Sequence, residues 1–259
     1  MTIQPRIAID AMGGDEGVRV MISGAALARH RHDRFRFLIF GDEARIARAL
    51  DQHPNLRAAS EIVHTDEVVT GEDKPSQAIR KRKSSMALAI DAVKSGEAGA
   101  AVSAGNTGAL MAMSKLALRT MPGIDRPALA ALLPTLESRD VVVLDLGANT
   151  DCDKRNLVQF AVMGAAYARI LYEDEERPAV GLLNIGTEEL KGRDEIREAA
   201  IYLRENSQLP VDFRGFVEPD KITRGDYRVV VADGFSGNVA LKSIEGAARF
   251  VTDLLKDAF

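Results

Sequence analysis

Short apolar runs alternate with longer stretches of helical periodicity throughout this 259-residue chain. The apolar runs are Arg6–Asp10, Phe35–Phe40, Glu61–His64, Ala100–Ser103, Ala128–Leu133, Val141–Asp145, Val180–Ile185, Val211–Phe216 and Val229–Asp233. The helical stretches are Glu16–Arg29, Asp42–Leu50, Ser76–Ser95, Thr107–Arg119, Leu157–Tyr172, Asp194–Asn206 and Val239–Phe259. Strands that alternate with helices pair mainly in parallel, and the connecting helices cover both faces of the sheet. The alternation predicts an α/β, Rossmann-like three-layer fold with a mostly parallel sheet.

The composition agrees with a sheet that is buried on both faces. Hydrophobic residues make up 46% of the chain, but Trp is absent and aromatic residues account for only 5%. Ala, Val, Leu and Ile must therefore fill the core, as parallel sheets covered by helices require. No low-complexity tract or obvious linker divides the sequence, so we expect one domain or two closely wound lobes.

Charge and cysteine content argue against several classes of protein. The formal net charge of −4 is unlike that of a general nucleic-acid binder. Cys152 is the only cysteine, so no internal disulfide can form and a reducing compartment is expected. The first residues run into a strand pattern without a signal-peptide core, and Gly or charged residues interrupt every long apolar stretch. We expect a soluble cytoplasmic protein.

Five predicted strands end in similar turns, in which a small polar residue is followed by glycine and then by Asn, Thr or Ser. The turns are 9–15 (IDAMGGD), 102–108 (VSAGNTG), 144–150 (LDLGANT), 183–188 (LNIGTE) and 232–238 (ADGFSGN). Glycine lets the backbone approach a ligand closely, and N–H groups at a helix start lack intrahelical acceptors. Because parallel strands end at one rim, the turns predict a phosphate site there. The alternative is that these residues only make good turns and N-caps.

Motifs for nucleotides and metals do not occur in the sequence. Neither G-x-x-x-x-G-K-[ST] nor G-x-G-x-x-G is present, so no nucleotide cofactor is expected. The four histidines all precede residue 65 and show no metal-ligand spacing, so no metal site is expected.

Several longer segments follow the pattern of one known family. They are IAIDAMGGD (7–15), residues 84–109 ending in VSAGNTGA, DLGANTDC (145–152), QFAVMGAAY (159–167), LNIGTEELK (183–191), GFVE (215–218) and VVVADGFSGNVALKSIEG (229–246). These segments resemble the bacterial phosphate acyltransferase family, the acyl-acyl-carrier-protein:phosphate transacylases of phospholipid synthesis. The resemblance implies transfer of a long-chain fatty acyl group from acyl-ACP to inorganic phosphate, which gives an acyl phosphate.

The resemblance also implies properties of the whole protein. These are a homodimer, peripheral contact with the inner face of the cell membrane, no cofactor or metal, and a fold related to phosphotransacetylases and isocitrate-type dehydrogenases. Family members continue beyond the position of Phe259 into another helix and a glycine-rich strand. We therefore expect residues 1–259 to form a single α/β catalytic domain that lacks the family's C-terminal segment.

Two residues are predicted to be catalytic. Lys191 follows the turn at 183–188, and the resemblance carries it over as catalytic; its ammonium would bind phosphate and stabilise the oxyanion of the intermediate. The alternative for Lys191 is a solvated loop lysine. Asn238 lies near the start of the last helix and would donate an amide N–H to the same charge, or act only as an N-cap.

The remaining candidates come from the turns. We predict phosphate or substrate binding by Asp10, Gly13, Gly14, Ser103, Gly105, Asn106, Thr107, Gly147, Asn149, Gly186, Thr187, Asp233, Ser236 and Gly237. The carboxylates at strand ends, including Asp145, would orient N–H groups or only make local turn hydrogen bonds. Cys152 suggests covalent catalysis, but the flanking Asp151 and Asp153 oppose thiolate formation, so no nucleophilic role is assigned.

Two surface features predict partners. The basic run Arg80, Lys81, Arg82 and Lys83 would dock the acidic acyl carrier protein, or is a solvated helix face. The last helix has an apolar stripe that would pack against the sheet or a dimer partner, or contact a membrane. Two other functions stay open, a phosphotransacetylase that uses acyl-CoA and a non-catalytic acyl-ACP-binding scaffold.

Overall fold

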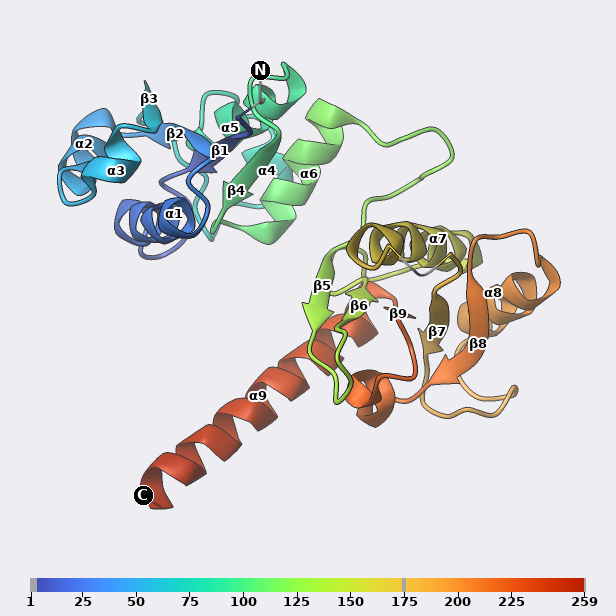
Figure 1. Cartoon of the computed structure of the whole chain (residues 1–259). Coiled ribbons are helices and arrows are strands. Elements are labelled where there is room, and N and C mark those ends of the chain that lie inside the picture. The colour runs from blue at the N-terminus through green and yellow to red at the C-terminus, as the bar shows by residue number, and fades with distance from the viewer. Residues whose placement is uncertain (1–3, 174–175, 259) are drawn as a thin grey trace. The chain divides into compact units, whose positions relative to one another are not determined.

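The computed structural model describes residues 4–173 and 176–258. The chain divides into two compact units, Met1–Met121 and Pro122–Phe259, and each has its own sheet (Figure 1).

The first unit has a parallel sheet with the strand order β3-β2-β1-β4. Its strands are β1 (Arg6–Asp10), β2 (Arg36–Gly41), β3 (Ser60–His64) and β4 (Ala100–Ser103). Its helices are α1 (Val18–Arg31), α2 (Glu43–Leu50), α3 (Pro54–Arg57), α4 (Pro75–Ala78), α5 (Ser85–Lys94) and α6 (Thr107–Leu118). Helices α1, α2 and α3 pack on one face around Ile9 and Ile39, and α5 packs on the other around Ala8 and Leu38.

The second unit has a sheet with the order β5-β6-β9-β7-β8, in which only β5 is antiparallel to its neighbour. The strands are β5 (Ala130–Leu133), β6 (Val141–Leu144), β7 (Ala179–Leu183), β8 (Asp212–Val217) and β9 (Val229–Val231). The helices are α7 (Lys154–Leu171), α8 (Asp194–Glu205), the 3₁₀ helix η1 (Pro219–Arg224) and α9 (Gly234–Ala258).

Alternate residues of the central strands point to opposite faces and build two cores in this unit. Val229 and Val231 of β9 pack against α7 and α8, whereas Val230 packs against η1 and the start of α9. The rest of α9 extends away from the sheet as a long exposed helix (Figure 1).

The structure confirms the predicted α/β class and the predicted strands, which it shifts by at most two residues at an end. The strands form two sheets, however, instead of one. The predicted helix Ser76–Ser95 is wrong in its middle, because residues 79–84 form turns between α4 and α5. Ser84 caps α5 by accepting the backbone N–H of Ala87, and Thr65 donates to the carbonyl of Lys83, so the chain is held out of helix there.

The last helix begins five residues earlier than predicted, at Gly234 instead of Val239. Asp233 explains the earlier start, because its carboxylate accepts the backbone N–H of Ser236 at 2.9 Å, as an N-cap does. The predicted end of this helix, Phe259, lies outside the described residues. Within the described residues, no helix combines the length and the apolar character needed to cross a membrane.

Candidate functional site

Three turns lie side by side at the carboxyl edge of the second sheet. Strand β9 pairs in parallel with β6 on one side and β7 on the other, so the three strands end together. The residues that follow them are Asp145, Asp233 and Asn184, all buried. Ligands of open α/β sheets collect at this edge. The predicted turns at 144–150, 183–188 and 232–238 are neighbours there, whereas the turns at 9–15 and 102–108 follow strands of the other sheet, so the prediction that all five turns share one sheet edge is wrong.

Asp145 holds the first of these turns. It is completely buried, and its carboxylate accepts the backbone N–H groups of Leu129 (2.9 Å), Gly147 (3.2 Å), Ala148 (3.0 Å) and Asn149 (2.7 Å). The Asn149 side-chain amide adds a fifth hydrogen bond at 2.7 Å. A buried carboxylate needs such donors, since it has lost its water. The N–H groups that we expected to face a bound anion are thus used inside the protein.

Glycines let the first and third turns touch. The N–H of Gly234 donates to the carbonyl of Asn149 at 2.7 Å. A Cβ at Gly237 would lie only 1.9 Å from the Asp145 carbonyl oxygen, and one at Gly147 would lie 2.7 Å from Nδ2 of Asn238. Any side chain at these positions would force the turns apart, so the glycines bring the exposed amide of Asn238 directly over Gly147.

Asp233 organises the third turn and links it to the second. Its carboxylate is 3% exposed and accepts both the backbone N–H and the hydroxyl of Ser236, at 2.9 and 2.8 Å. The N–H of Gly237 donates to the Asp233 carbonyl at 2.9 Å. On the other side, Nη1 of Arg193 lies 3.8 Å from the Asp233 carboxylate. The polar groups of Ser236 and Gly237 are therefore also used within the protein.

Lys191 lies on the turn after β7. The Asn184 side-chain amide donates to the Lys191 carbonyl at 3.0 Å and so holds this loop against the end of β7. The stem of Lys191 and the carboxylate of Glu188 both pass over Gly186, where a Cβ would lie 2.6 Å from the Glu188 carboxylate oxygen. Nζ of Lys191 is 3.5 Å from that carboxylate, and the lysine side chain is 52% exposed. Thr187 is exposed beside it.

The surroundings of Glu188 change the pKa of its carboxyl group. The backbone N–H of Glu188, followed by the nearby Lys191 ammonium, lowers the pKa of the Glu188 carboxyl below its ordinary value. Lys191 thus faces a single carboxylate that water also reaches, so an incoming dianion can compete for the ammonium.

In the first unit, Asp10 also serves as an internal acceptor. It is 1% exposed and accepts the hydroxyls of Ser85 and Ser103 at 2.5 and 2.7 Å. Ser103 in turn accepts the N–H of Gly105 at 3.0 Å. A Cβ at Gly13 would lie 2.6 Å from the Asp10 carboxylate, so these residues form one tight cluster.

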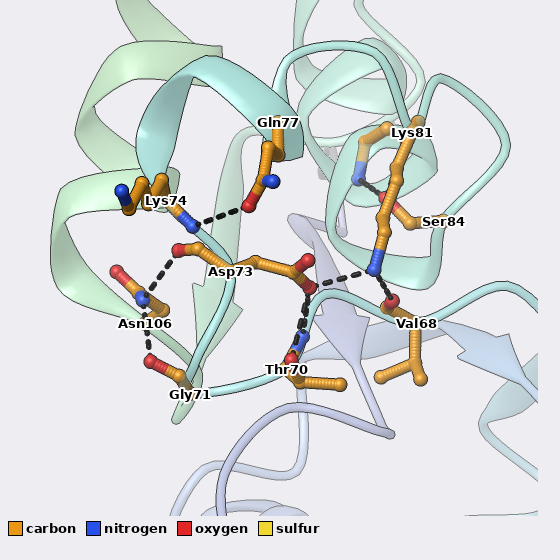
Figure 2. Close-up of polar contacts among 10 residues, drawn as sticks. Val68, Thr70, Gly71, Asp73, Lys74, Gln77, Lys81, Ser84 and Asn106 are labelled. Carbon is orange, nitrogen blue, oxygen red and sulfur yellow. Dashed lines mark hydrogen bonds and ion pairs between the residues drawn. The ribbon is translucent and has the colours of Figure 1, made fainter.

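The turn after β4 continues into α6. Asn106 caps that helix by accepting the N–H of Ala109 at 3.0 Å, and its amide group donates to the carbonyls of Gly71 and Asp73 (Figure 2). The Asn106 side chain is therefore occupied. Thr107 is exposed at the first position of α6, where the backbone N–H has no intrahelical acceptor. Gly14 has a φ of +79°, and a Cβ there would approach the Ala104 carbonyl at 2.7 Å.

The basic run divides into one internal and three exposed cations. Lys81 donates to the Asp73 carboxylate at 2.6 Å and to the Val68 carbonyl at 3.0 Å, as Figure 2 shows. This ammonium is the first cause of the lowered pKa of the Asp73 carboxyl. Arg80, Arg82 and Lys83 are exposed on the turns between α4 and α5. The basic run is thus a loop, and the expectation of a basic helix is wrong.

Cys152 is buried next to the candidate site, with its sulfur 3.5 Å from the Asn149 carbonyl. Burial raises the pKa of the Cys152 thiol to about 11, and the charges of Asp145 and Asp233 act in the same direction. A neutral thiol is a weak nucleophile. Within residues 4–173 and 176–258, no group of three or more His, Cys, Asp or Glu side chains could hold a metal ion.

Sequence reasoning assigned no role to three residues that now stand out. Arg193 follows Lys191 by two positions on the same loop, and this spacing was a usable signal. Asn184 occupies the strand-end position that Asp10 has in the first turn, so the repeat itself pointed to it. Ser85 lies 75 residues from Asp10 along the chain, and nothing local reveals that contact.

The family model described as "Fatty acid synthesis protein" matches residues 5–259. A phosphate acyltransferase of Erythrobacter litoralis is 71% identical over 256 residues, which are 98% of this chain and 72% of that protein. A phosphate acyltransferase of Bradyrhizobium diazoefficiens is 58% identical over 259 residues, 99% of this chain and 73% of that protein.

A solved structure supports the fold. A phosphotransacetylase from Streptococcus pyogenes superposes with a TM-score of 0.66 at 20% identity, over 95% of this chain and 82% of that one. At this identity the likeness concerns the fold alone. The family model and the two relatives each cover nearly the whole sequence, and the chain therefore belongs to the bacterial phosphate acyltransferase family.

Proposed function

We propose that this protein transfers a fatty acyl group from a thioester to inorganic phosphate and so makes acyl phosphate for phospholipid synthesis. The observation that carries the proposal is the edge of the second sheet, where Lys191 and Asn238 project from turns that buried carboxylates hold in place. The similarity to proteins named phosphate acyltransferase supports the same reaction.

The chemistry needs few protein groups because a thioester is already activated. A phosphate oxygen attacks the carbonyl carbon, the C=O becomes a tetrahedral oxyanion, and the C–S bond then breaks to release a thiolate that takes up a proton. In our proposal the Lys191 ammonium exchanges Glu188 for phosphate and stabilises the developing negative charge. The exposed Asn238 amide donates a hydrogen bond to the same oxyanion. Because the amide is neutral, it does not repel the Lys191 ammonium.

The structure changes how we assign the other predicted residues. The amides of Gly147, Asn149, Ser236 and Gly237 donate within the protein, so they do not surround phosphate as bare donors. We propose that Asp10, Asp145 and Asp233 position their turns and do not touch phosphate. In the first unit, we propose that the exposed Thr107 donates to substrate through its backbone N–H, which has no intrahelical acceptor.

We also propose the finer properties that the family resemblance implies. The acyl donor is a long-chain acyl-ACP, and the exposed cations Arg80, Arg82 and Lys83 attract the acidic carrier protein. The protein acts as a homodimer in the cytoplasm, with peripheral contact at the membrane, and residues 1–259 act as a single α/β catalytic domain.

A second candidate is a phosphotransacetylase that uses acyl-CoA, and a solved protein of that name has the same fold. A scaffold that binds acyl-ACP without reaction is the third. One assay separates them, in which palmitoyl-ACP and acetyl-CoA are each incubated with and without phosphate while thiol release and acyl phosphate are measured. Phosphate-dependent release from palmitoyl-ACP supports our proposal. Preference for acetyl-CoA, or binding without release, supports the second or third candidate instead.

A further inference from the structure

A pocket of about 640 Å³ opens beside the candidate site within the second unit. Asn184, Gly192, Arg193 and Ser236 line the end nearest the sheet edge. From there the pocket follows α9, whose residues Val239, Ala240, Ser243, Ile244 and Ala247 form one wall. Leu183, Ile196 and Pro219 line other parts of the pocket. One end is therefore polar and adjoins Lys191, and the remainder is largely apolar.

Apolar side chains at this pocket are exposed to water. Ile185 is 76% exposed, Phe235 is 64% exposed and Val239 is 52% exposed, although all three line it. Covering such surface with an apolar ligand stabilises the complex in proportion to the area removed from water. The volume is also within the range of small-molecule sites.

We infer that this pocket holds the hydrocarbon chain of the acyl donor, an inference that rests on the proposed acyl transfer. Its length favours a long chain, because the twelve residues from Ser236 to Ala247 span about 16 Å of helix. An acetyl group would fill only the polar end. The thioester carbonyl of the acyl donor would then lie at the sheet edge, next to Lys191 and Asn238.

The charges around the pocket agree with an acyl chain and disagree with a nucleotide. Arg193 is the one cationic side chain in the described lining, and it already lies near the Asp233 carboxylate. The other charged lining residue, Asp220, is an exposed carboxylate that would repel phosphates. A coenzyme A headgroup carries several phosphates, and Arg193 is the only cation that the described lining offers them.

The absence of Trp from the chain allows a direct test. The substitution Ala247→Trp introduces the only indole and fills the end of the pocket that lies farthest along α9 from Ser236. Ala248→Trp is the matched control, since Ala248 is exposed on the same helix but does not line the pocket. Both variants are made in this chain and assayed with phosphate and ACP thioesters of increasing chain length.

We expect kcat/KM of the unaltered protein to rise roughly fourfold per added methylene until the pocket is full. Ala247→Trp should lower kcat/KM for palmitoyl-ACP by roughly tenfold or more and leave butyryl-ACP within about twofold. The emission of Trp at 247, and not at 248, should shift to the blue when palmitoyl-ACP binds.

Each contrary result has a distinct meaning. If the unaltered protein forms no acyl phosphate from any thioester, the proposed function fails. If it does form acyl phosphate but the two variants share one chain-length profile, only the pocket assignment is overturned. An emission shift that follows protein concentration, or added phosphatidylglycerol vesicles, would instead assign this face to a second copy or to a membrane.

Discussion

At the scale of single residues, Lys191 and Asn238 differ from the buried aspartates of the predicted site because their side chains are exposed, and among the described residues the Lys191 ammonium pairs only with the exposed Glu188. Lys191→Ala and Asn238→Ala should each lower turnover on the order of a hundred- to a thousandfold, as loss of an oxyanion donor does. The melting temperature should stay nearly constant because both side chains are exposed. Acyl phosphate formation measures the effect, with Lys242→Ala as an exposed-lysine control. Near-normal turnover in either variant would remove its assigned role.

The thiol of Cys152 gives a prediction about pH. Its pKa of about 11 in the folded protein lies above the ordinary value of 9.0, so at pH 8 about a hundredfold less thiolate is present than in the unfolded chain. Iodoacetamide should therefore modify the native protein far more slowly than the urea-unfolded protein, and the native rate should rise with pH towards 11. Cys152→Ser should retain acyl transfer. Rapid alkylation of the native protein at pH 7 would contradict the buried, neutral thiol.

At the scale of elements, the loop between α4 and α5 separates two roles within one basic run. Charge reversal at Arg82 or Lys83 should raise KM for acyl-ACP and weaken the dependence of KM on salt, because exposed charges act through long-range attraction. Lys81→Glu should instead lower stability, since Lys81 pairs with Asp73 and the Val68 carbonyl. Steady-state kinetics at several salt concentrations, together with thermal unfolding, distinguish the two effects. Unchanged kinetics at both exposed positions would place the carrier protein elsewhere.

Alanine substitutions at two glycines of α9 should change the stability of the protein in opposite directions. Gly237→Ala should destabilise the protein by about 1–3 kcal/mol or more, because the new methyl group would overlap the Asp145 carbonyl. Gly246→Ala should stabilise it by about 0.5–1 kcal/mol, since no atom lies within 4 Å and alanine favours helix. Urea unfolding measures both. A neutral Gly237→Ala would mean that the first and third turns can separate freely.

The elements also show what the sequence can and cannot reveal. Strand Arg6–Asp10 was predicted to the residue, because a short apolar run ends at a polar residue and a glycine turn. The break in Ser76–Ser95 was missed because it depends on Thr65, whose bond to Lys83 spans 18 residues. The sequence reveals that the turns repeat. It does not reveal that the buried Asp145 carboxylate accepts the backbone N–H groups of its own turn.

At the scale of the whole molecule, the sequence predicted one sheet, whereas two sheets form because β1 and β4 pair with each other and β5 begins a separate ladder. Alternation of strands and helices predicts a layered α/β fold, but it does not predict which strands belong to the same sheet. The stretch between α6 and β5 contains Pro122, Gly123 and Pro127, residues that are typical of turns. It contains the division between the two units.

Each unit has its own hydrophobic core in the described part of the chain. The clusters around Ile9, Met86 and Ala8 draw only on residues before 122, and those around Phe160 and Val230 draw only on later ones. A fragment of residues 122–259 should therefore fold alone and unfold cooperatively in urea. It should also protect Cys152 from iodoacetamide as well as the whole chain does, because the neighbours that bury this thiol all lie in the same unit. A fragment with native helix content but a rapidly alkylated thiol would show that the second core requires the first unit.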